Sequence, residues 1–160
     1  MTFNTTDLCD EHGDQARVVA LPLIDFGARA RCAGPAVTVK CFEDNSRIKA
    51  LSRQPGEGRV LVVDGGGSHR CALLGDVIAE DLMNNGWAGV IINGCIRDKA
   101  ALAGLDIAIK ALGTSPRKSV KRDEGQVGLA VDIGSQSITD GDRIYADEDG
   151  VIVLDTPAGQ

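Results

Sequence analysis

An arginine and an aspartate are neighbours near the middle of the chain. Twenty residues separate this pair from another aspartate that precedes it. Asp76 lies in the segment LLGDVI (residues 73–78), and Arg97 and Asp98 end the segment GVIINGCIRD (residues 89–98). The guanidinium fork of arginine matches a carboxylate or a 2-oxo acid at two points, and an aspartate can hold a hard divalent cation. Arg97 and Asp98 together are therefore suited to bind a metal-chelated keto acid.

The pair Arg97 and Asp98 follows a short apolar run, which places it at the exit of a predicted strand. Residues 90–92 (VII) have the composition of a buried strand, and Gly94 allows the chain to turn just beyond it. In α/β proteins, ligands bind outside the carboxyl ends of the strands. The same dipeptide also occurs where a solvated helix starts, with the aspartate as cap or as partner of the helix dipole. The dipeptide by itself leaves both interpretations open.

The composition is that of one globular domain with an aliphatic core, and we expect this domain to span residues 1–160. A chain of this length can bury a core of its own. Aromatic residues make up only 3% of it, so the core must consist of valine, isoleucine, leucine and alanine, as in α/β sheets. The net charge of -6 argues against nucleic acid as a direct partner, because surfaces that bind nucleic acid are basic.

The five cysteines do not form a zinc-finger or disulfide pattern, because their number is odd and no CxxC spacing occurs. Most of them stand beside apolar residues, which predicts buried and reduced thiols. The first seven residues contain neither the basic nor the apolar region of a signal peptide. No apolar run approaches the roughly 20 residues of a membrane span. These features predict a cytoplasmic protein that does not enter the membrane.

Strands and helices alternate through the middle of the chain, and short strands follow toward its end. Alternating or continuous apolar runs predict strands over residues 36–42, 59–64, 87–93, 107–111, 127–133, 137–138, 143–146 and 151–154. Helical spacing predicts helices over residues 6–10, 45–51, 73–85 and 99–104, the third with an apolar face of Leu74, Val77, Ile78, Leu82 and Met83. A turn is expected at Gly34 and Pro35, before the first of these strands. The pattern predicts one α/β or α+β domain with a mixed sheet.

Three further features give only weak indications of a site. The glycines at 65–67 follow a predicted strand, but neither the phosphate-loop spacing nor the dinucleotide-binding spacing is present. Their backbone could still come close to a ligand carboxylate. The two histidines have no partner four residues on, and no histidine follows Cys95 in a way that suggests a nucleophile pair.

The order of the segments resembles that of the family of regulator of ribonuclease activity A, which is shared with the class II 4-hydroxy-4-methyl-2-oxoglutarate aldolases. The resemblance extends from about residue 5 to Asp155. It is carried by residues 6–10 (TDLCD), 34–39 (GPAVTV), 62–67 (VVDGGG), 74–76 (LGD), 93–98 (NGCIRD) and 141–151 (GDRIYADEDGV). It implies a compact α/β sandwich of the swivelling phosphohistidine-domain type, with β/β/α layers, assembled as a ring-shaped homotrimer.

In the aldolase branch of that family, an aspartate is followed after twenty residues by Arg-Asp, and Asp76, Arg97 and Asp98 match this pattern. The match implies that these three residues are catalytic, with Asp76 orienting Arg97 or a water. Asp98 would anchor a divalent metal cofactor, Mg²⁺ or Mn²⁺, partly through water. The residues implied to bind the pyruvate part of the substrate are Arg97 and the backbone of Gly75, Asp76, Val77 and Ile78.

The implied function is that of a metal-dependent carbon–carbon lyase on 2-oxo acids. It would have 4-hydroxy-4-methyl-2-oxoglutarate aldolase and oxaloacetate decarboxylase activities that share a pyruvate enolate. The alternative is a non-catalytic regulator that binds and inhibits ribonuclease E. Such regulators commonly lack the aspartate equivalent to Asp98, so its presence favours the enzyme. Two features depart from the longer aldolases and concern aldol cleavage rather than enolate chemistry: Ala101 replaces a common acidic residue, and the sequence does not extend beyond Gln160.

Overall fold

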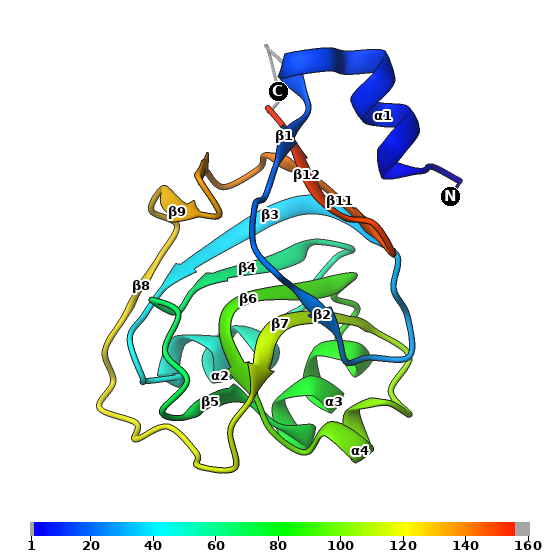
Figure 1. Ribbon diagram of the computed structural model, residues 1–160. Coiled ribbons are helices and arrows are strands. Elements are labelled where there is room, and N and C mark those ends of the chain that lie inside the picture. Colours follow the sequence, from blue (N-terminus) through cyan, green and yellow to red (C-terminus); the bar gives the residue numbers. More distant parts are fainter. Residues whose placement is uncertain (1, 156–160) are drawn as a thin grey trace.

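The computed structural model, which describes residues 2–155, is a curled sheet with helices on one side. Figure 1 shows α2 (Ser46–Ser52), α3 (Asp76–Asn84) and α4 (Lys99–Leu102) together below the central strands, with the last two strands of the chain at the top of the view. The first helix, α1 (Thr5–His12), projects at the N-terminus and contacts these last two strands. The layers agree with the predicted mixed α/β class.

Four parallel strands form the centre of the sheet. They are β3 (Cys32–Lys40), β4 (Val60–Asp64), β6 (Gly89–Ile96) and β7 (Ala108–Thr114), and they are neighbours in this order. Each consecutive pair is joined through one of the helices α2, α3 and α4. Because the strand order always advances in the same direction, right-handed crossovers place all three helices on one face. The carboxyl ends of the parallel strands therefore meet at one edge of the sheet.

Antiparallel strands extend the sheet at both sides. From β3 the order continues to β11 (Arg143–Asp147), β12 (Gly150–Leu154) and β1 (Arg17–Val18), and at the other side β2 (Ile24–Asp25) pairs with β7. Two short strands join from the side, β5 (Ala72–Leu74) on β6 and β8 (Gln126–Val127) on β3. A hairpin outside this sheet consists of β9 (Val131–Ile133) and β10 (Gln136–Ile138), and a 3-10 helix, Gly13–Gln15, follows α1.

The sheet separates two apolar cores, which explains why its central strands are apolar without interruption. Val63 faces the helices and belongs to the core that contains Ile48 of α2 and Leu82 of α3. Val62, next to it in sequence, belongs to the opposite core, together with Ile144 of β11. All five side chains are fully buried. Burial of each contributes roughly 1.5–3 kcal/mol to stability.

The turn predicted at Gly34 and Pro35 is wrong, because β3 begins at Cys32 and continues through both residues. A close approach of the chain requires the glycine: a Cβ on Gly34 would lie 2.1 Å from the carbonyl oxygen of Gly58. Pro35 occupies a register position opposite Arg143 of β11. Both residues therefore serve strand packing rather than chain reversal.

The helix predicted over residues 73–85 is wrong at its start. Leu73 and Leu74 belong to β5, and α3 begins only at Asp76. The predicted apolar face is also partly wrong, because Val77 is 67% exposed. Two adjacent leucines fit a strand end as well as a helix face, and a strand of three residues is too short to show a period of its own.

The strand β6 extends three residues beyond the predicted strand 87–93, so that it includes Gly94. The turn expected at this glycine is therefore wrong. The side chain of Leu73 packs so closely that a Cβ on Gly94 would lie 3.2 Å from it. Because β6 continues to Ile96, Arg97 is the first residue after the strand.

The other predicted elements are confirmed within a few residues, except that the strand predicted over residues 127–133 is divided between β8 and β9. The divided region surrounds Gly128, which has a positive φ of 87°. Glycine adopts this conformation without the steric cost that other residues incur. In the described part of the chain, no helix is both long enough and apolar enough to cross a membrane.

Candidate functional site

The two segments that carry the predicted site residues leave neighbouring strands at the same edge of the sheet. The strand β5 pairs in parallel with β6, with Leu74 opposite Ile96. The N–H of Arg97 donates to the carbonyl oxygen of Leu74 at 2.9 Å. Asp76 therefore emerges beside Arg97 and Asp98, although twenty residues separate Asp76 from Arg97.

The carboxylate of Asp98 caps the helix that begins at Asp76. Its Oδ2 accepts a hydrogen bond from the N–H of Asp76 at 3.0 Å. The N-terminus of α3 favours a negative group at this place. Although Asp98 directly precedes α4, it makes no side-chain cap to that helix. Asp98 thus does act as a helix cap, one of the two interpretations of the dipeptide, but it caps α3 and not α4. Its Oδ1 accepts no hydrogen bond from any residue between 2 and 155.

The backbone at Asp98 and the glycine at position 75 make this contact possible. Asp98 is in the left-handed region, with φ 60° and ψ 40°, which aspartate adopts more readily than most residues. At position 75, a Cβ would lie 2.8 Å from Asp98 Oδ2 and 3.4 Å from Arg97 Nε. Gly75 therefore allows both side chains to approach the N-terminus of α3.

Arg97 and residues 75–78 line one small hollow of about 140 Å³. The structure thus brings together all the residues predicted to bind substrate. Asp98 lies at their side, exposed to solvent and joined to them through Asp76. No ion pair links the carboxylate of Asp76 to Arg97 in the described chain, so the predicted orienting contact between these two side chains is not present.

Four further polar residues line this hollow, and the sequence motifs did not indicate them: Asn45, Lys49, Lys118 and Lys121. Lys49 comes from the last turn of α2, and the other two lysines come from residues 115–122 (SPRKSVKR). This segment concentrates four basic residues in a chain of net charge -6. Such a concentration is a signal for an anion site that the sequence does offer.

The cations around the hollow lack carboxylate partners. None of Arg97, Lys49, Lys118 and Lys121 forms an ion pair with another residue of the described chain. The pKa of Lys121 is lowered, first by burial and then by the positive charges of Lys49, Lys118 and Arg97, while Asp44 acts in the opposite direction. A bound anion would relieve this repulsion among cations.

Hydrogen bonds fix the basic segment beside the hollow. The N–H of Ala72 in β5 donates to the carbonyl oxygen of Arg117 at 2.7 Å. The Oγ of the buried Ser119 accepts a hydrogen bond from the N–H of Asn45 at 3.3 Å. The side-chain Nδ2 of Asn45 donates to the carbonyl oxygen of Leu73 at 3.1 Å. The lysines of this segment are thus held at the hollow by the fold.

The end of the basic segment is fixed by the carboxylate of Asp44, which is buried. This carboxylate accepts hydrogen bonds from the N–H groups of Arg122 and Glu124, at 2.7 and 3.2 Å. It also accepts from the N–H and the hydroxyl of Ser46, at 2.8 and 2.5 Å. Burial acts to raise the pKa of Asp44, but the hydrogen bonds outweigh it and hold the pKa at about 2.

We expect Asp44→Asn to lower the free energy of unfolding at neutral pH by an amount on the order of 2 kcal/mol. The folded pKa of about 2 lies below the usual value, so the charge stabilises the fold above about pH 4 and this contribution is lost as the pH falls through the folded pKa. Urea unfolding of wild type and variant near pH 7, 4 and 2.5 should show a difference that shrinks with acid. A difference that stays constant over this range would contradict the role given to the Asp44 charge.

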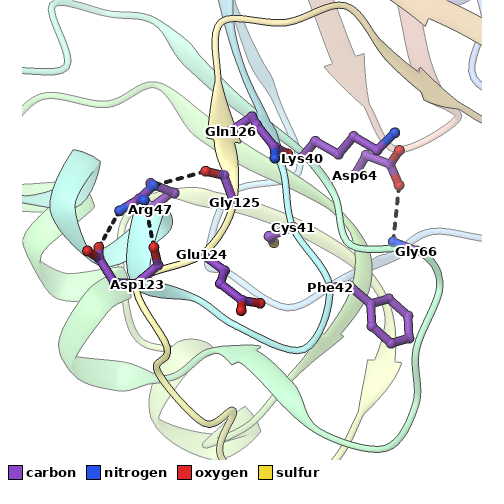
Figure 2. A pocket seen from close by; sticks show the side chains of 10 residues that line it. All are labelled: Lys40, Cys41, Phe42, Arg47, Asp64, Gly66, Asp123, Glu124, Gly125 and Gln126. Carbon is purple, nitrogen blue, oxygen red and sulfur yellow. Dashed lines mark hydrogen bonds and ion pairs between the residues drawn. The ribbon is translucent and has the colours of Figure 1, made fainter.

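A larger hollow of about 570 Å³ lies at the ends of β3 and β4, but its lining carries both signs of charge, partly paired. Figure 2 shows Arg47 bonded to the carboxylate of Asp123, at 2.6 Å, and to the carbonyl oxygen of Gly125, at 3.1 Å. It also shows Asp64 accepting from the N–H of Gly66, at 3.0 Å. Because the cations of the smaller hollow are unpaired, we place the candidate site there rather than in the larger one.

Cys95 does have a histidine partner, which precedes it in the sequence. Its Sγ lies 3.2 Å from Nδ1 of His69. The sequence offers no histidine that follows Cys95, and so it did not indicate this contact with His69. Burial raises the pKa of Cys95, which keeps the sulfur a thiol and disfavours a role as nucleophile. The expectation of buried thiols is confirmed for four cysteines, whereas Cys9 is partly exposed.

A metal ion at the smaller hollow would take few ligands from the protein itself. Within residues 2–155, no group of three histidine, cysteine, aspartate or glutamate side chains is placed to hold one. Asp76 is the acidic residue that lines the hollow, and Asp98 lies beside it, with Oδ1 free of protein hydrogen bonds in the described chain. Mg²⁺ prefers oxygen ligands and usually keeps several waters. The residues present therefore fit a magnesium-type ion whose coordination is completed by water and substrate.

The similar proteins all indicate one family, but their names describe different activities. The model of a family described as RraA-like, Aldolase/RraA, matches residues 5–153. A protein of Alkalilimnicola ehrlichii is 53% identical over 153 residues, which are 96% of this chain and 95% of its own. A protein of Laribacter hongkongensis is 51% identical over 157 residues, which are 98% of this chain and 99% of its own. Both are provisionally named 4-hydroxy-4-methyl-2-oxoglutarate aldolase.

Solved structures of similar proteins confirm the fold. One, described as S-adenosylmethionine: 2-dimethylmenaquinone methyltransferase from Geobacillus kaustophilus, has a TM-score of 0.94 and 41% identity over 98% of this chain and 97% of its own. Another, the RNA-processing inhibitor RraA from Thermus thermophilis, has a TM-score of 0.93 and 38% identity over 99% of this chain and 97% of its own. Because the names of these relatives differ in activity, the function has to be argued from the site.

Proposed function

The chain belongs to the RraA-like family, and on that premise we propose that it is a divalent-metal-dependent carbon–carbon lyase acting on 2-oxo acids. The proposed reactions are the cleavage of 4-hydroxy-4-methyl-2-oxoglutarate and the decarboxylation of oxaloacetate. The names of the relatives at 51–53% identity support the first. The observation that carries the proposal is that Arg97 and the N-terminus of α3 meet at a hollow lined by unpaired cations, with Asp98 hydrogen-bonded to that N-terminus.

The pyruvate part of either substrate offers a carboxylate and a 2-oxo oxygen to this site. The N–H groups of Val77 and Ile78 lie in the first turn of α3, where no preceding helical carbonyl can accept them. Such groups, together with the helix dipole, bind anions. Arg97 lines the same hollow and can engage two oxygens at once through its guanidinium fork. These groups would hold the pyruvate part in one orientation.

Both reactions break the bond between C3 and C4 and leave its electron pair on the pyruvate part as an enolate. From oxaloacetate, the other fragment departs as CO₂. From 4-hydroxy-4-methyl-2-oxoglutarate, it departs as a second pyruvate once the C4 hydroxyl has lost its proton. Protonation of the enolate carbon then completes either reaction. Arg97 contributes by placing positive charge at the oxygen where negative charge develops, as an oxyanion site does.

Asp98 is the residue that we expect to hold the divalent metal, through Oδ1 and through water. When bound there, Mg²⁺ or Mn²⁺ supplies Lewis acidity toward the 2-oxo oxygen of the substrate. The hydrogen bond from the N–H of Asp76 to Oδ2 sets the orientation of the Asp98 carboxylate. Partners of this kind commonly orient the ligands of a metal.

A coupled assay of pyruvate release tests the proposal. We expect release from oxaloacetate and from 4-hydroxy-4-methyl-2-oxoglutarate in magnesium buffer, because both reactions use the same enolate, and we expect EDTA to stop it. Addition of excess Mg²⁺ or Mn²⁺ after EDTA should restore the rate and identify the preferred metal. A preparation that releases no pyruvate from either substrate would contradict the lyase.

A second candidate function is the regulation of RNA processing. It is favoured by the 38% identity with the RNA-processing inhibitor RraA from Thermus thermophilis. A non-catalytic regulator that binds ribonuclease E needs neither a metal nor Asp98, and the net charge of -6 suits docking to a basic surface. If wild type and Asp98→Asn inhibit ribonuclease E equally and neither releases pyruvate, this function takes the place of the lyase.

We further propose that the protein is a homotrimer with its sites at or near the subunit boundaries. A closed ring of three copies repeats one heterologous contact. Light scattering at micromolar concentration should then give three times the chain mass of 16.7 kDa. A mass equal to that of one chain would contradict the trimer.

A further inference from the structure

The hollow at Arg97 carries more positive charge than the pyruvate part of a substrate requires. One carboxylate and one 2-oxo oxygen are matched by Arg97 and by the N–H groups at the start of α3. Lys49, Lys118 and Lys121 line the same hollow in addition. The carboxylate of Asp76 is the single acidic side chain among the described lining residues. The excess of cations points to a second negative group on the ligand.

Two of these lysines come from separate elements that the fold fixes at the hollow. Lys49 is partly buried in the last turn of α2. Lys118 forms a parallel bridge with Ala72, directly before the strand end that leads to the site. The anchors at Arg117 and Ser119 hold the backbone on both sides of Lys118. Lys49 from α2 and the exposed Lys118 from the basic segment thus line the same small hollow.

We propose that Lys49 and Lys118 bind the distal carboxylate of the substrate, the one beyond the bond that breaks, and so select dicarboxylic over monocarboxylic 2-oxo acids. This inference rests on the proposed lyase function, because it assumes that Arg97 and α3 hold the pyruvate part. A hollow of about 140 Å³ keeps any bound anion within a few ångströms of its lining side chains. A dicarboxylate can therefore meet both groups of cations at once.

Charge pairing inside the hollow gives the selectivity a physical basis. The pKa of Lys121 is lowered by burial and by the positive charges of Lys49, Lys118 and Arg97, so each of these three cations repels Lys121. A monocarboxylate bound at Arg97 leaves the repulsion that Lys49 and Lys118 exert on Lys121 in place. A second carboxylate removes it and gains charge-assisted hydrogen bonds, which are roughly twice as strong as neutral ones.

A matched pair of uncleaved ligands, 2-oxoglutarate and 2-oxopentanoate, isolates the distal carboxylate, because the two differ only in that group. We expect calorimetry on wild type in magnesium buffer to show that 2-oxoglutarate binds about tenfold or more tightly, as expected for one additional charge-assisted contact. In the double variant Lys49→Gln, Lys118→Gln this preference should fall to near parity, while the Kd of 2-oxopentanoate should stay within about twofold.

The control is the double variant Lys40→Gln, Arg53→Gln, which removes two positive charges from residues outside the hollow. Both residues are exposed, and neither lines the smaller hollow. This variant should keep the full preference for 2-oxoglutarate, which separates a local contact from the effect of net charge. Thermal unfolding of both double variants checks that each is folded.

Turnover of oxaloacetate provides a second readout, because its distal carboxylate is the group that leaves as CO₂. Lysines that hold this group stabilise the bound substrate and not the departing neutral product. Lys49→Gln, Lys118→Gln should therefore raise KM for oxaloacetate about tenfold without lowering kcat, because a contact made mainly in the bound substrate does not speed the step that follows. A fall in kcat without a change in KM would contradict a role in substrate selection.

The inference and the proposed function fail in different ways. If wild type releases pyruvate and binds 2-oxopentanoate as tightly as 2-oxoglutarate, the lysines do not select the distal carboxylate and only the inference is overturned. The same holds if the Lys49→Gln, Lys118→Gln variant retains the full preference. If wild type binds neither ligand, the pyruvate site itself is wrong and both are overturned.

Discussion

Asp98→Asn should lower metal-dependent pyruvate release by about a thousandfold or more while leaving the fold unchanged. The loss of the carboxylate charge removes the metal anchor, and with it several kcal/mol of transition-state stabilisation. The asparagine Oδ1 can still accept the hydrogen bond that Asp76 donates, so the cap of α3 is kept. Asparagine also tolerates the left-handed backbone at this position, where φ is 60°. The measurement is the rate of pyruvate release from oxaloacetate in magnesium buffer.

Asp98→Ala separates the charge from the structural role when it is compared with Asp98→Asn. Alanine should lose the same activity and in addition about 1–2 kcal/mol of stability, because it lacks the cap and fits the left-handed backbone poorly. Asp7→Ala is a control that removes one acidic charge from α1, where the carboxylate accepts a hydrogen bond from Asn4 at 3.0 Å. If Asp98→Asn retains wild-type decarboxylation, or if EDTA leaves the wild type unaffected, the lyase is wrong and the regulator becomes the leading function.

The sequence predicted the central strands well, because their signal is local. Residues 59–64 form a continuous apolar run, and β4 is buried on both faces, so the run has only one interpretation. The strand β5 was not predicted, because Ala72, Leu73 and Leu74 are too few to show a period. This error matters for the site, since the pairing of Leu74 with Ile96 is what brings Asp76 to Arg97. The family resemblance predicted that Asp76, Arg97 and Asp98 act together, whereas the local sequence pattern did not.

The cations of the hollow could not be placed from sequence, because each depends on a contact between distant segments. Lys49 reaches the hollow from α2. Lys118 does so because Ala72 bonds to the residue before it, and because Asp44 holds the end of the same basic segment. The four basic residues at 115–122 were visible as a charge cluster, but nothing local indicated that they face Arg97. The sequence likewise shows a glycine at position 75. Only the structure explains it, because a Cβ there would collide with the Asp98 carboxylate.

Arg97→Ala should lower kcat by about a hundredfold to a thousandfold and raise KM as well. The side chain is assigned two tasks, and the alanine variant loses both. In the bound substrate, Arg97 makes a charge-assisted contact with the pyruvate part, so its loss weakens binding. In the transition state, it faces the oxygen that becomes negative, and the loss of one such donor costs about 2.7–4 kcal/mol. Steady-state kinetics with oxaloacetate, which give kcat and KM separately, measure both losses.

Arg97→Lys separates the contribution of the two-point contact made by the guanidinium from the contribution of its positive charge. Lysine keeps one positive charge but cannot bind two oxygens in parallel, so we expect it to restore part of kcat and little of KM. Because a Cβ at position 75 would lie 3.4 Å from Arg97 Nε, the arginine side chain packs close to Gly75 at the start of the helix. A lysine lacks that packing and would move within the hollow. If Arg97→Ala changed neither kcat nor KM, the pyruvate part would have to bind elsewhere, and the convergence of β5 and β6 at this edge would need another purpose.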